Sequence, residues 1–219
     1  MWALIVATLL CVAMVGTRAL WMHRLSYGFL LWNLFLAWLP LAIALFAAEE
    51  YRKAGRLEWR LGTLAVAWLI FFPNAPYIFT DLIHLARFRQ HYWVDLVLVL
   101  TCALTGLVVG FISFFLMQSV VKRLYGSRWS WGFVVGASLL SGFGIYIGRI
   151  LRFNSWDVVV RPVAFSREIG RWASDPFASS QTFAFPALFG VFVLTSYLLF
   201  YALTHLRHPQ VPVPDSTAQ

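Results

Sequence analysis

One face of a predicted helix collects five polar side chains: Tyr77, Thr80, Asp81, His84 and Arg87. They occupy positions i, i+3, i+4, i+7 and i+10, which lie together on an α-helix. A carboxylate and an imidazole three residues apart can exchange protons near neutral pH, so we predict Asp81 and His84 as catalytic residues. Zinc and iron accept the same oxygen and nitrogen ligands, which makes this pair the candidate ligands of a divalent metal.

A second polar cluster lies further along the chain: Arg149, Arg152, Asn154, Ser155 and Asp157. Guanidinium groups bind phosphate through two hydrogen bonds, so Arg149 and Arg152 are candidates for holding an anionic group such as a lipid phosphate. Asp157 adds a carboxylate that we predict to be catalytic. Ser155 does not lie in a Gly-x-Ser-x-Gly sequence, which argues against a serine hydrolase.

These two regions also resemble a known family. The segments FPNAPYIFTDLIHL and GRILRFNSWDVV are similar to the two signature stretches of a bacterial integral-membrane family catalogued as domain of unknown function 1361. The resemblance covers most of the chain from the second or third span onward, and it implies an inner-membrane location but no activity. It also implies that ten residues act together: the catalytic candidates Asp81, His84 and Asp157, and the substrate-binding candidates Asn74, Tyr77, Thr80, Arg149, Arg152, Asn154 and Ser155.

The composition indicates which solvent surrounds these residues. Of 219 residues, 61% are hydrophobic and 12% are charged, whereas about a quarter of the residues of a soluble domain are charged. Apolar runs of about 20 residues recur and indicate membrane spans. The formal net charge is +8, but Lys and Arg lie in short segments between these runs, which favours membrane lipids over nucleic acid as partners. We expect one transmembrane domain over residues 1–206 and a disordered tail over residues 207–219.

The apolar runs predict an all-α polytopic bundle of about six spans. Five spans are continuous and cover about residues 2–17, 28–48, 94–121, 131–151 and 183–205. The first span reaches residue 22 if Arg18 extends its head to the membrane interface. Glycine pairs four residues apart allow close helix packing, either within the chain or against another membrane protein or a second copy. These pairs are Gly106 with Gly110, Gly132 with Gly136, and Gly144 with Gly148.

The third span differs from the others. Residues 61–72 supply 12 residues, or about 18 Å of helix, which is too short for a hydrocarbon core about 30 Å thick. The sequence Pro73-Asn74-Ala75-Pro76 then interrupts the helix, because each proline removes an amide donor and disfavours helical geometry in the residue before it. We predict a second helical piece over about residues 77–88, with Asn74 as its N-cap.

The segment between the fifth and sixth spans predicts an interfacial helix. Phe165, Ile169 and Trp172 lie at i, i+4 and i+7 with charged residues elsewhere on the helix, as in helices that lie on a membrane. Lys and Arg counts favour cytoplasmic termini only when the arginines of the second cluster are left out. Spans three and five run in the same direction, so both polar clusters are expected at one face, predicted to be periplasmic, where they can converge.

Three classes of function fit these observations. The first is an enzyme acting on an anionic lipid-like or amphiphilic substrate, with Asp81 or His84 as general base. The second is a transporter, because its binding site is often lined by a discontinuous helix. The third is a structural subunit of a membrane complex. A simpler interpretation also stands, in which Asp81 and Asp157 neutralise the two arginines in an ion-pair network.

Overall fold

The computed structural model describes residues 2–87, 91–153, 157–174 and 180–205. This part of the chain is almost entirely helical and has no strand, and six helical segments in it are long and apolar enough to cross a membrane, which confirms the predicted class. The predicted disordered tail lies outside the described residues, and the single domain stays a prediction. The elements are α1 (Trp2–Met22), α2 (Gly28–Ala54), α3 (Trp59–Phe71), α4 (Asn74–Tyr77), the 3₁₀ helix η1 (Ile78–Arg87), α5 (Tyr92–Tyr125), α6 (Ser127–Arg149), α7 (Asp157–Val160), α8 (Pro162–Ser174) and α9 (Ser180–Thr204).

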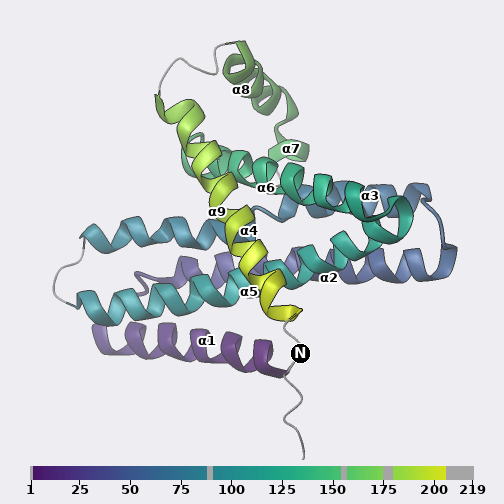
Figure 1. The fold of residues 1–219 in the computed structure, drawn as a ribbon. Helices are drawn as coiled ribbons and strands as arrows, with labels where there is room; N and C mark the ends of the chain where they lie inside the picture. The colour runs from purple at the N-terminus through teal and green to yellow at the C-terminus, as the bar shows by residue number, and fades with distance from the viewer. Residues whose placement is uncertain (1, 88–90, 154–156, 175–179, 206–219) are drawn as a thin grey trace, which may run out of the picture.

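The long helices pack against one another in a bundle, and α9 crosses it obliquely in the view of Figure 1. α2 packs against α3 and α5, and α6 packs against α9 and α5. α1 lies at the bottom of the view in Figure 1, against α5 and α2, whereas α8 lies at the top, beyond α6. The short helix α4 contacts α2, α5 and α6, so the break in the third span lies inside the bundle.

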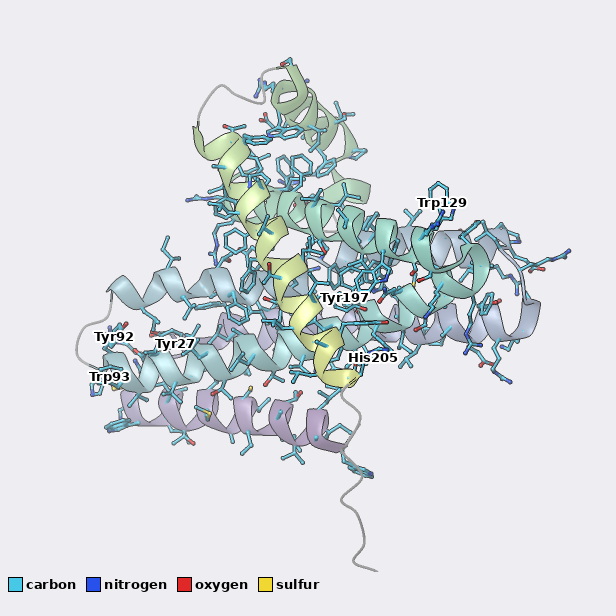
Figure 2. The ribbon with its side chains drawn as sticks, in the orientation of Figure 1. Tyr27, Tyr92, Trp93, Trp129, Tyr197 and His205 are labelled. Atoms are coloured by element: carbon cyan, nitrogen blue, oxygen red, sulfur yellow. The ribbon has the colours of Figure 1, made fainter. Side chains whose placement is uncertain are left out.

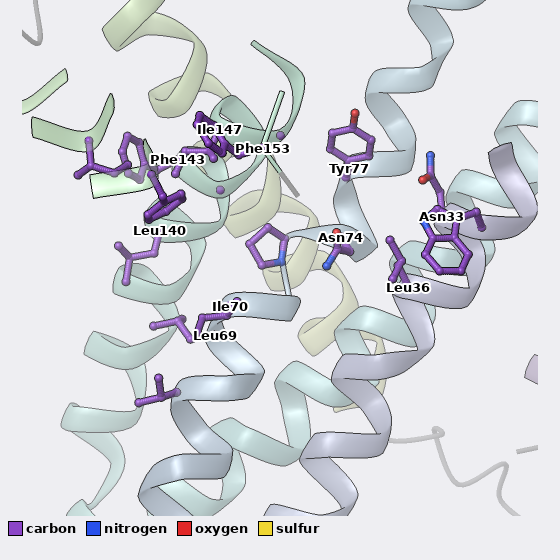
Figure 3. Close-up of a pocket in the computed structure, with 17 residues that line it drawn as sticks. Asn33, Leu36, Leu69, Ile70, Asn74, Tyr77, Leu140, Phe143, Ile147 and Phe153 are labelled. Atoms are coloured by element: carbon purple, nitrogen blue, oxygen red, sulfur yellow. The ribbon is translucent and has the colours of Figure 1, made fainter. Parts of the chain in front are cut away.

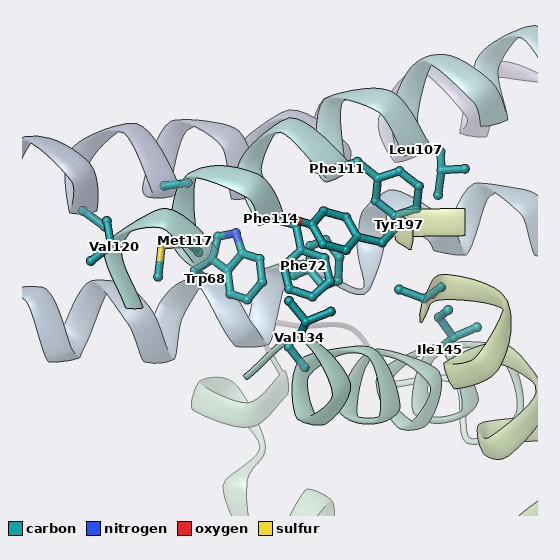
Figure 4. Packing of buried hydrophobic residues seen from close by; sticks show 14 of the residues in the cluster. Trp68, Phe72, Leu107, Phe111, Phe114, Met117, Val120, Val134, Ile145 and Tyr197 are labelled. Carbon is teal, nitrogen blue, oxygen red and sulfur yellow. The ribbon is translucent and has the colours of Figure 1, made fainter. Parts of the chain in front are cut away.

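An aromatic cluster joins α3, α5, α6 and α9 (Figure 4). The ring centroids of Phe114 and Tyr197 lie 4.4 Å apart. The Trp68 indole donates to Ser113 Oγ at 3.1 Å, and the Tyr197 hydroxyl donates to Gln118 Oε1 at 2.6 Å. Because the polar atoms of these large rings have partners, the rings can be fully buried, and they fix how the four helices pack.

Exposed aromatic residues mark the two ends of the long helices. Figure 2 shows Tyr92 and Trp93 at one end of the bundle and Trp129 at the opposite end. Trp93 and Trp129 are 75% and 72% exposed. Amphipathic rings favour the headgroup level of a bilayer, and many exposed Leu, Val and Ile side chains lie on the helices between the two ends. This pattern agrees with six helices embedded in hydrocarbon.

The third span is broken where the prolines predicted it. α3 ends at Phe71, and α4 begins at Asn74. The predicted N-cap is wrong: Pro73, which already has helical dihedral angles, precedes α4, and Asn74 lies inside the helix. The Asn74 side chain instead donates from Nδ2 to the Phe71 carbonyl at 2.9 Å, and so binds one of the carbonyls left without a partner at the end of α3.

The prediction of an α-helix after Tyr77 is also wrong, because Ile78–Arg87 forms a 3₁₀ helix. In a 3₁₀ helix the side chains at i and i+3 align. The α-helical spacing used to place five polar residues on one face therefore does not apply to this segment. The 3₁₀ form also rises about 2.0 Å per residue, so the broken span crosses more membrane than its residue count suggests.

Two glycine pairs allow close packing around the break. A Cβ atom at Gly106 would lie 2.6 Å from Ile78 Cδ1, and one at Gly110 would lie 2.5 Å from Ala75 Cβ. On α6, a Cβ atom at Gly144 would lie 2.5 Å from Pro73 Cγ. These glycines pack against other parts of the same chain, which is one of the two kinds of packing expected for the glycine pairs. No described atom outside their own helix turn lies within 4 Å of a Cβ placed at Gly132 or Gly136.

Several helices extend beyond their predicted ends. α2 continues to Ala54 instead of ending at residue 48, because Arg52 and Lys53 pair with Glu49 at 2.8 and 3.5 Å along the helix. α5 covers residues 92–125, and α6 begins at residue 127 instead of 131. The charged residues at these ends extend the helices beyond the apolar runs.

Candidate functional site

The Asp81 carboxylate is the centre of a buried polar network. Asp81 is 1% exposed. Arg149 donates from Nη2 to its Oδ1 at 2.5 Å, and Asn33 donates from Nδ2 to its Oδ2 at 2.8 Å. Both carboxylate oxygens therefore accept a hydrogen bond, and a guanidinium compensates the negative charge. An ionised carboxylate is stable in such a buried position only with partners of this kind.

Arg149 is held by groups on the third span. Its Nε and Nη2 donate to Thr80 Oγ1 at 2.9 and 2.5 Å. Its guanidinium carbon lies 4.7 Å from the centroid of the Tyr77 ring. The Thr80 hydroxyl in turn donates to the Tyr77 carbonyl at 2.6 Å. Spans three and five therefore meet through these four residues, as predicted, while their roles in substrate binding or catalysis stay predictions.

The other predicted residues of the two polar clusters are Arg152, Asp157, His84, Asn154 and Ser155. Arg152 is exposed, has a φ of 60° and forms no ion pair with any described residue. Asp157 is buried, and its Oδ1 lies 3.9 Å from Nε of Arg161, the residue between α7 and α8. The backbone of His84 belongs to η1, but its side chain lies outside the described residues, as do Asn154 and Ser155.

A cavity of about 370 Å³ adjoins the Asp81–Arg149 pair (Figure 3). We call it the lateral groove. Asn33 and Tyr77 line it and also contact the ion pair, so the pair lies directly behind the groove wall. The lining residues are Trp32, Asn33 and Leu36 of α2, Val66, Leu69 and Ile70 of α3, Pro73, Asn74 and Tyr77 at the break, Leu140, Phe143, Gly144, Ile147 and Gly148 of α6, and Phe153, Phe165 and Ile169.

Polar and apolar residues are separated in the lateral groove. Figure 3 shows Asn33, Asn74 and Tyr77 close together on one side, above the apolar side chains of Leu69 and Ile70. We call the first three residues the polar end. The tight approach of α6 helps to form it, because a Cβ atom at Gly148 would lie 3.1 Å from Tyr77 Cε2.

The lateral groove is open along its apolar part. Three of its lining side chains, Trp32, Val66 and Leu140, are 52%, 60% and 51% exposed. They belong to three segments that are long and apolar enough to cross a membrane.

Helix α8 covers one end of the lateral groove. Phe165 and Ile169 line the groove, and the ring centroids of Trp172 and Phe143 lie 4.5 Å apart. The Trp172 indole donates to the Thr182 carbonyl at 3.2 Å. This carbonyl lacks its usual helical partner in α9, because Pro186, four residues later, has no amide hydrogen. The predicted apolar face of α8 therefore exists and packs against the protein. Its position on a membrane surface stays a prediction.

A second buried ion pair was missed by the sequence analysis. Arg18 donates to Asp95 from Nε at 2.7 Å and from Nη2 at 3.2 Å. Arg18 is 7% exposed and Asp95 is fully buried, so the carboxylate on α5 holds the arginine head inside the protein. That this head lies at the membrane interface stays a prediction. Burial beside Asp95 raises the pKa of Tyr27 to about 12, and its phenol therefore stays neutral.

The described residues contain no group of three or more His, Cys, Asp or Glu side chains arranged to hold a metal ion. Of the proposed ligand pair, Asp81 is described, and the His84 imidazole lies outside the described side chains. The metal site stays a prediction. Asp81 already uses both oxygens in hydrogen bonds to Arg149 and Asn33.

Fold and site together define a polytopic helical membrane protein with a lateral groove that adjoins a buried ion pair. The chain belongs to the family described as "Protein of unknown function (DUF1361)", whose family model matches residues 32–196. This match confirms the resemblance. It contains both ion-pair residues, Asp81 and Arg149, and all the lining residues of the groove. No curated protein and no solved structure matches the chain.

Proposed function

We propose that this membrane protein binds an anionic, lipid-like amphiphile, with the apolar chain in the lateral groove and the head group at the polar end. The observation that carries this proposal is the combination of an apolar part that opens to hydrocarbon and a polar end beside a buried ion pair. A water-soluble ligand would gain little from contact with the open apolar part. A plain hydrocarbon would form no hydrogen bonds with the three polar side chains at the other end.

The length of the groove fits one leaflet. One unbroken helix from Val66 to Tyr77 would rise about 16 Å at 1.5 Å per residue, and the break makes the real rise shorter. The hydrocarbon core of a bilayer is about 30 Å thick, so the groove spans at most about half of it. An acyl or prenyl chain anchored at the polar end would end near the bilayer midplane.

The volume favours a single chain. About 370 Å³ lies near the lower limit of small-molecule sites, which have volumes of about 300–1,000 Å³. This space suits one apolar chain with part of its head group. We therefore infer that a two-chain lipid, if bound, leaves its second chain in the bilayer.

Positive charge near the polar end favours an anionic head group. The chain from Arg149 to Arg171 contains five arginines and two described aspartate or glutamate residues, and Arg152 is exposed without an ion-pair partner among the described residues. Guanidinium groups recognise carboxylate and phosphate through paired hydrogen bonds. We propose Arg152 as the residue that meets the anionic group at the groove entrance.

The ion pair supports a role in shaping the site. Asp81 is almost fully buried and has a donor on each oxygen, an arrangement that stabilises a buried carboxylate. We propose that Asp81 and Arg149 hold the polar end together, and that the protein lies in the bacterial inner membrane with both termini in the cytoplasm. The groove then opens to the periplasmic leaflet.

The experiment compares two valine-to-tryptophan variants. Val66 is 60% exposed and lines the groove, whereas Val97 is 53% exposed on α5 and does not line it. Purified proteins are analysed by native mass spectrometry in a detergent that removes loosely bound lipid. We expect Val66→Trp to lose the bound amphiphile at least about tenfold, because the indole fills the groove, and Val97→Trp to retain it. Equal occupancy in wild type and both variants would contradict the proposal.

A further inference from the structure

The side-chain amide of Asn33 has a fixed orientation at the polar end of the lateral groove. Its Nδ2 donates to Asp81 Oδ2 at 2.8 Å. A reversed amide would bring two acceptor oxygens together at this distance, which is repulsive. Asp81 is itself buried and accepts a hydrogen bond from Arg149, so it cannot move aside. The amide oxygen of Asn33, Oδ1, is therefore turned away from the Asp81 carboxylate.

This Oδ1 atom is an accessible hydrogen-bond acceptor. None of the described residues donates a hydrogen bond to it. Part of its surface is accessible, because it does not belong to the fully buried polar atoms that lack a hydrogen bond among the described residues. Asn33 lines the lateral groove. A ligand in the groove can therefore reach this acceptor, and it satisfies the acceptor only if it brings a donor.

The Tyr77 hydroxyl is a second accessible polar group, on a ring that is held in place. The Arg149 guanidinium carbon lies 4.7 Å from the ring centroid. Helix α6 approaches the ring edge so closely that a Cβ atom at Gly148 would lie 3.1 Å from Cε2. Within the described part of the chain, the Tyr77 hydroxyl forms no hydrogen bond, and it is not fully buried. A phenol can donate as well as accept.

Asn33 and Tyr77 belong to one site. Asn33 donates to Asp81, which accepts from Arg149 at 2.5 Å, and the Arg149 guanidinium lies against the Tyr77 ring. Both Asn33 and Tyr77 line the groove, and Figure 3 shows them at its polar end. The polar end thus presents an acceptor and a donor. A hydroxyl group matches both, because it donates one hydrogen bond and accepts others, whereas an ionised carboxylate only accepts.

From this arrangement we infer that Asn33 and Tyr77 recognise a hydroxyl group of the ligand, so that the ligand is a hydroxylated amphiphile such as a single-chain glycerolipid. The inference rests on the proposed function and adds the class of head group to it. It assigns Asn33 and Tyr77 as specificity-determining residues. A site that pairs with a hydroxyl rejects the analogue that lacks it, because the polar groups of the site then lose their partners.

The test compares two single-chain probes that differ by one hydroxyl group. One is a lysophosphatidic acid with an ether-linked chain, and the other is the same molecule without its free hydroxyl. The chain and the phosphate are identical, so chain length and charge have no effect on the comparison. Both probes are added at equal concentration to the purified full-length protein in detergent, and native mass spectrometry gives the ratio of the two complexes. We expect the wild type to prefer the hydroxylated probe by about tenfold.

Two variants each remove one of the recognising atoms. Tyr77→Phe removes the hydroxyl and keeps the ring against Arg149, and it should reduce the preference about fivefold. Asn33→Leu removes Oδ1 with a side chain of similar shape and should bring the ratio of complexes close to that of the two probes in solution. Asn33→Leu also removes a donor to Asp81. If this variant does not fold, Tyr77→Phe alone decides the test.

Tyr92→Phe is the matched control. Tyr92 is 42% exposed at the start of α5 and does not line the groove, so this variant should keep the wild-type ratio. If the wild type binds both probes equally, or if Tyr77→Phe keeps the wild-type ratio, recognition of a hydroxyl is overturned while the proposed function stands. If the wild type binds neither probe, the proposed function fails, and this inference fails with it.

Discussion

At the scale of single residues, the stability of the site depends on paired charges in a low-dielectric environment. We predict that Arg149→Ala lowers the free energy of unfolding by about 3–5 kcal/mol, because Asp81 would remain buried without its guanidinium. Arg161→Ala is the control, since Arg161 is 70% exposed and lies 3.9 Å from Asp157. Its loss should cost at most about 1 kcal/mol. Denaturation in mixed micelles measures both, and equal losses would refute the assignment.

The second ion pair predicts a different pattern. Arg18→Leu alone should lower the free energy of unfolding by about 3–5 kcal/mol, because it leaves Asp95 fully buried and charged. The double variant Arg18→Leu with Asp95→Leu should recover most of this loss, since two apolar side chains then replace two buried charges. A double-mutant cycle measures the coupling. Additive effects would show that the two residues act independently.

The sequence predicted part of the site at this scale. Tyr77, Thr80, Asp81 and Arg149 meet because helix direction and hydrophobic pattern place them at the same membrane face. Asn33 was not predicted as a site residue, because a single amide in an apolar span has no local pattern that gives its partner. Its hydrogen bond to Asp81 depends on how α2 packs on the third span, which only the tertiary structure shows.

At the scale of helices, close crossings depend on missing side chains. α6 and α9 approach so closely that a Cβ atom at Gly142 would lie 2.2 Å from the Pro186 carbonyl oxygen and 2.4 Å from the Gly190 nitrogen. Backbone atoms cannot move aside as a flexible side chain does. We predict that Gly142→Ala separates the two helices and lowers the free energy of unfolding by about 1–3 kcal/mol.

Gly136→Ala provides the comparison on the same helix. No described atom beyond its own helix turn lies within 4 Å of a Cβ at this position. Alanine should be neutral or stabilise the helix by about 0.5–1 kcal/mol. Denaturation of both variants in one detergent measures the difference. A large loss in Gly136→Ala would indicate that this face packs against another protein or a second copy.

Helix α8 gives a prediction about how the groove is covered. Trp172→Phe keeps an aromatic ring against Phe143 but removes the indole donor to the Thr182 carbonyl. We expect a loss of about 1 kcal/mol, together with faster hydrogen exchange of α8 amides measured by mass spectrometry. Trp129→Phe changes an exposed indole, 72% accessible, and should leave that exchange unchanged. Equal exchange rates in all three proteins would show that the indole bond does not hold α8.

Local rules predicted most elements but not their detailed form. Pro73 and Pro76 fixed the position of the break, because the loss of amide donors is independent of the surroundings. The 3₁₀ geometry of Ile78–Arg87 was not predictable in this way. Its residues contact Arg149 and pack on α5, and these long-range contacts favour it over an α-helix.

At the scale of the whole molecule, six segments are long and apolar enough to cross a membrane. If all six cross, both chain ends lie on the same side. We predict that reporter domains fused to residue 1 and to residue 219 are both active only in the cytoplasm, which would place the polar end of the groove toward the periplasm. A reporter inserted at Gly126, between α5 and α6, should give the same cytoplasmic result. Periplasmic activity of all three fusions would invert the orientation, and disagreement between the ends would contradict the six-span topology.

The Arg18–Asp95 contact also constrains biosynthesis. The two residues are 77 positions apart in the chain, so the first helix is made well before its partner exists. Until the helix with Asp95 enters the bilayer, the arginine has to stay hydrated near the phosphates, because an unpaired guanidinium is costly in lipid. The Arg18–Asp95 pair can form only after three later crossings have been inserted. A nascent chain that stalls earlier would present a first helix with an unpaired arginine to membrane quality-control proteases.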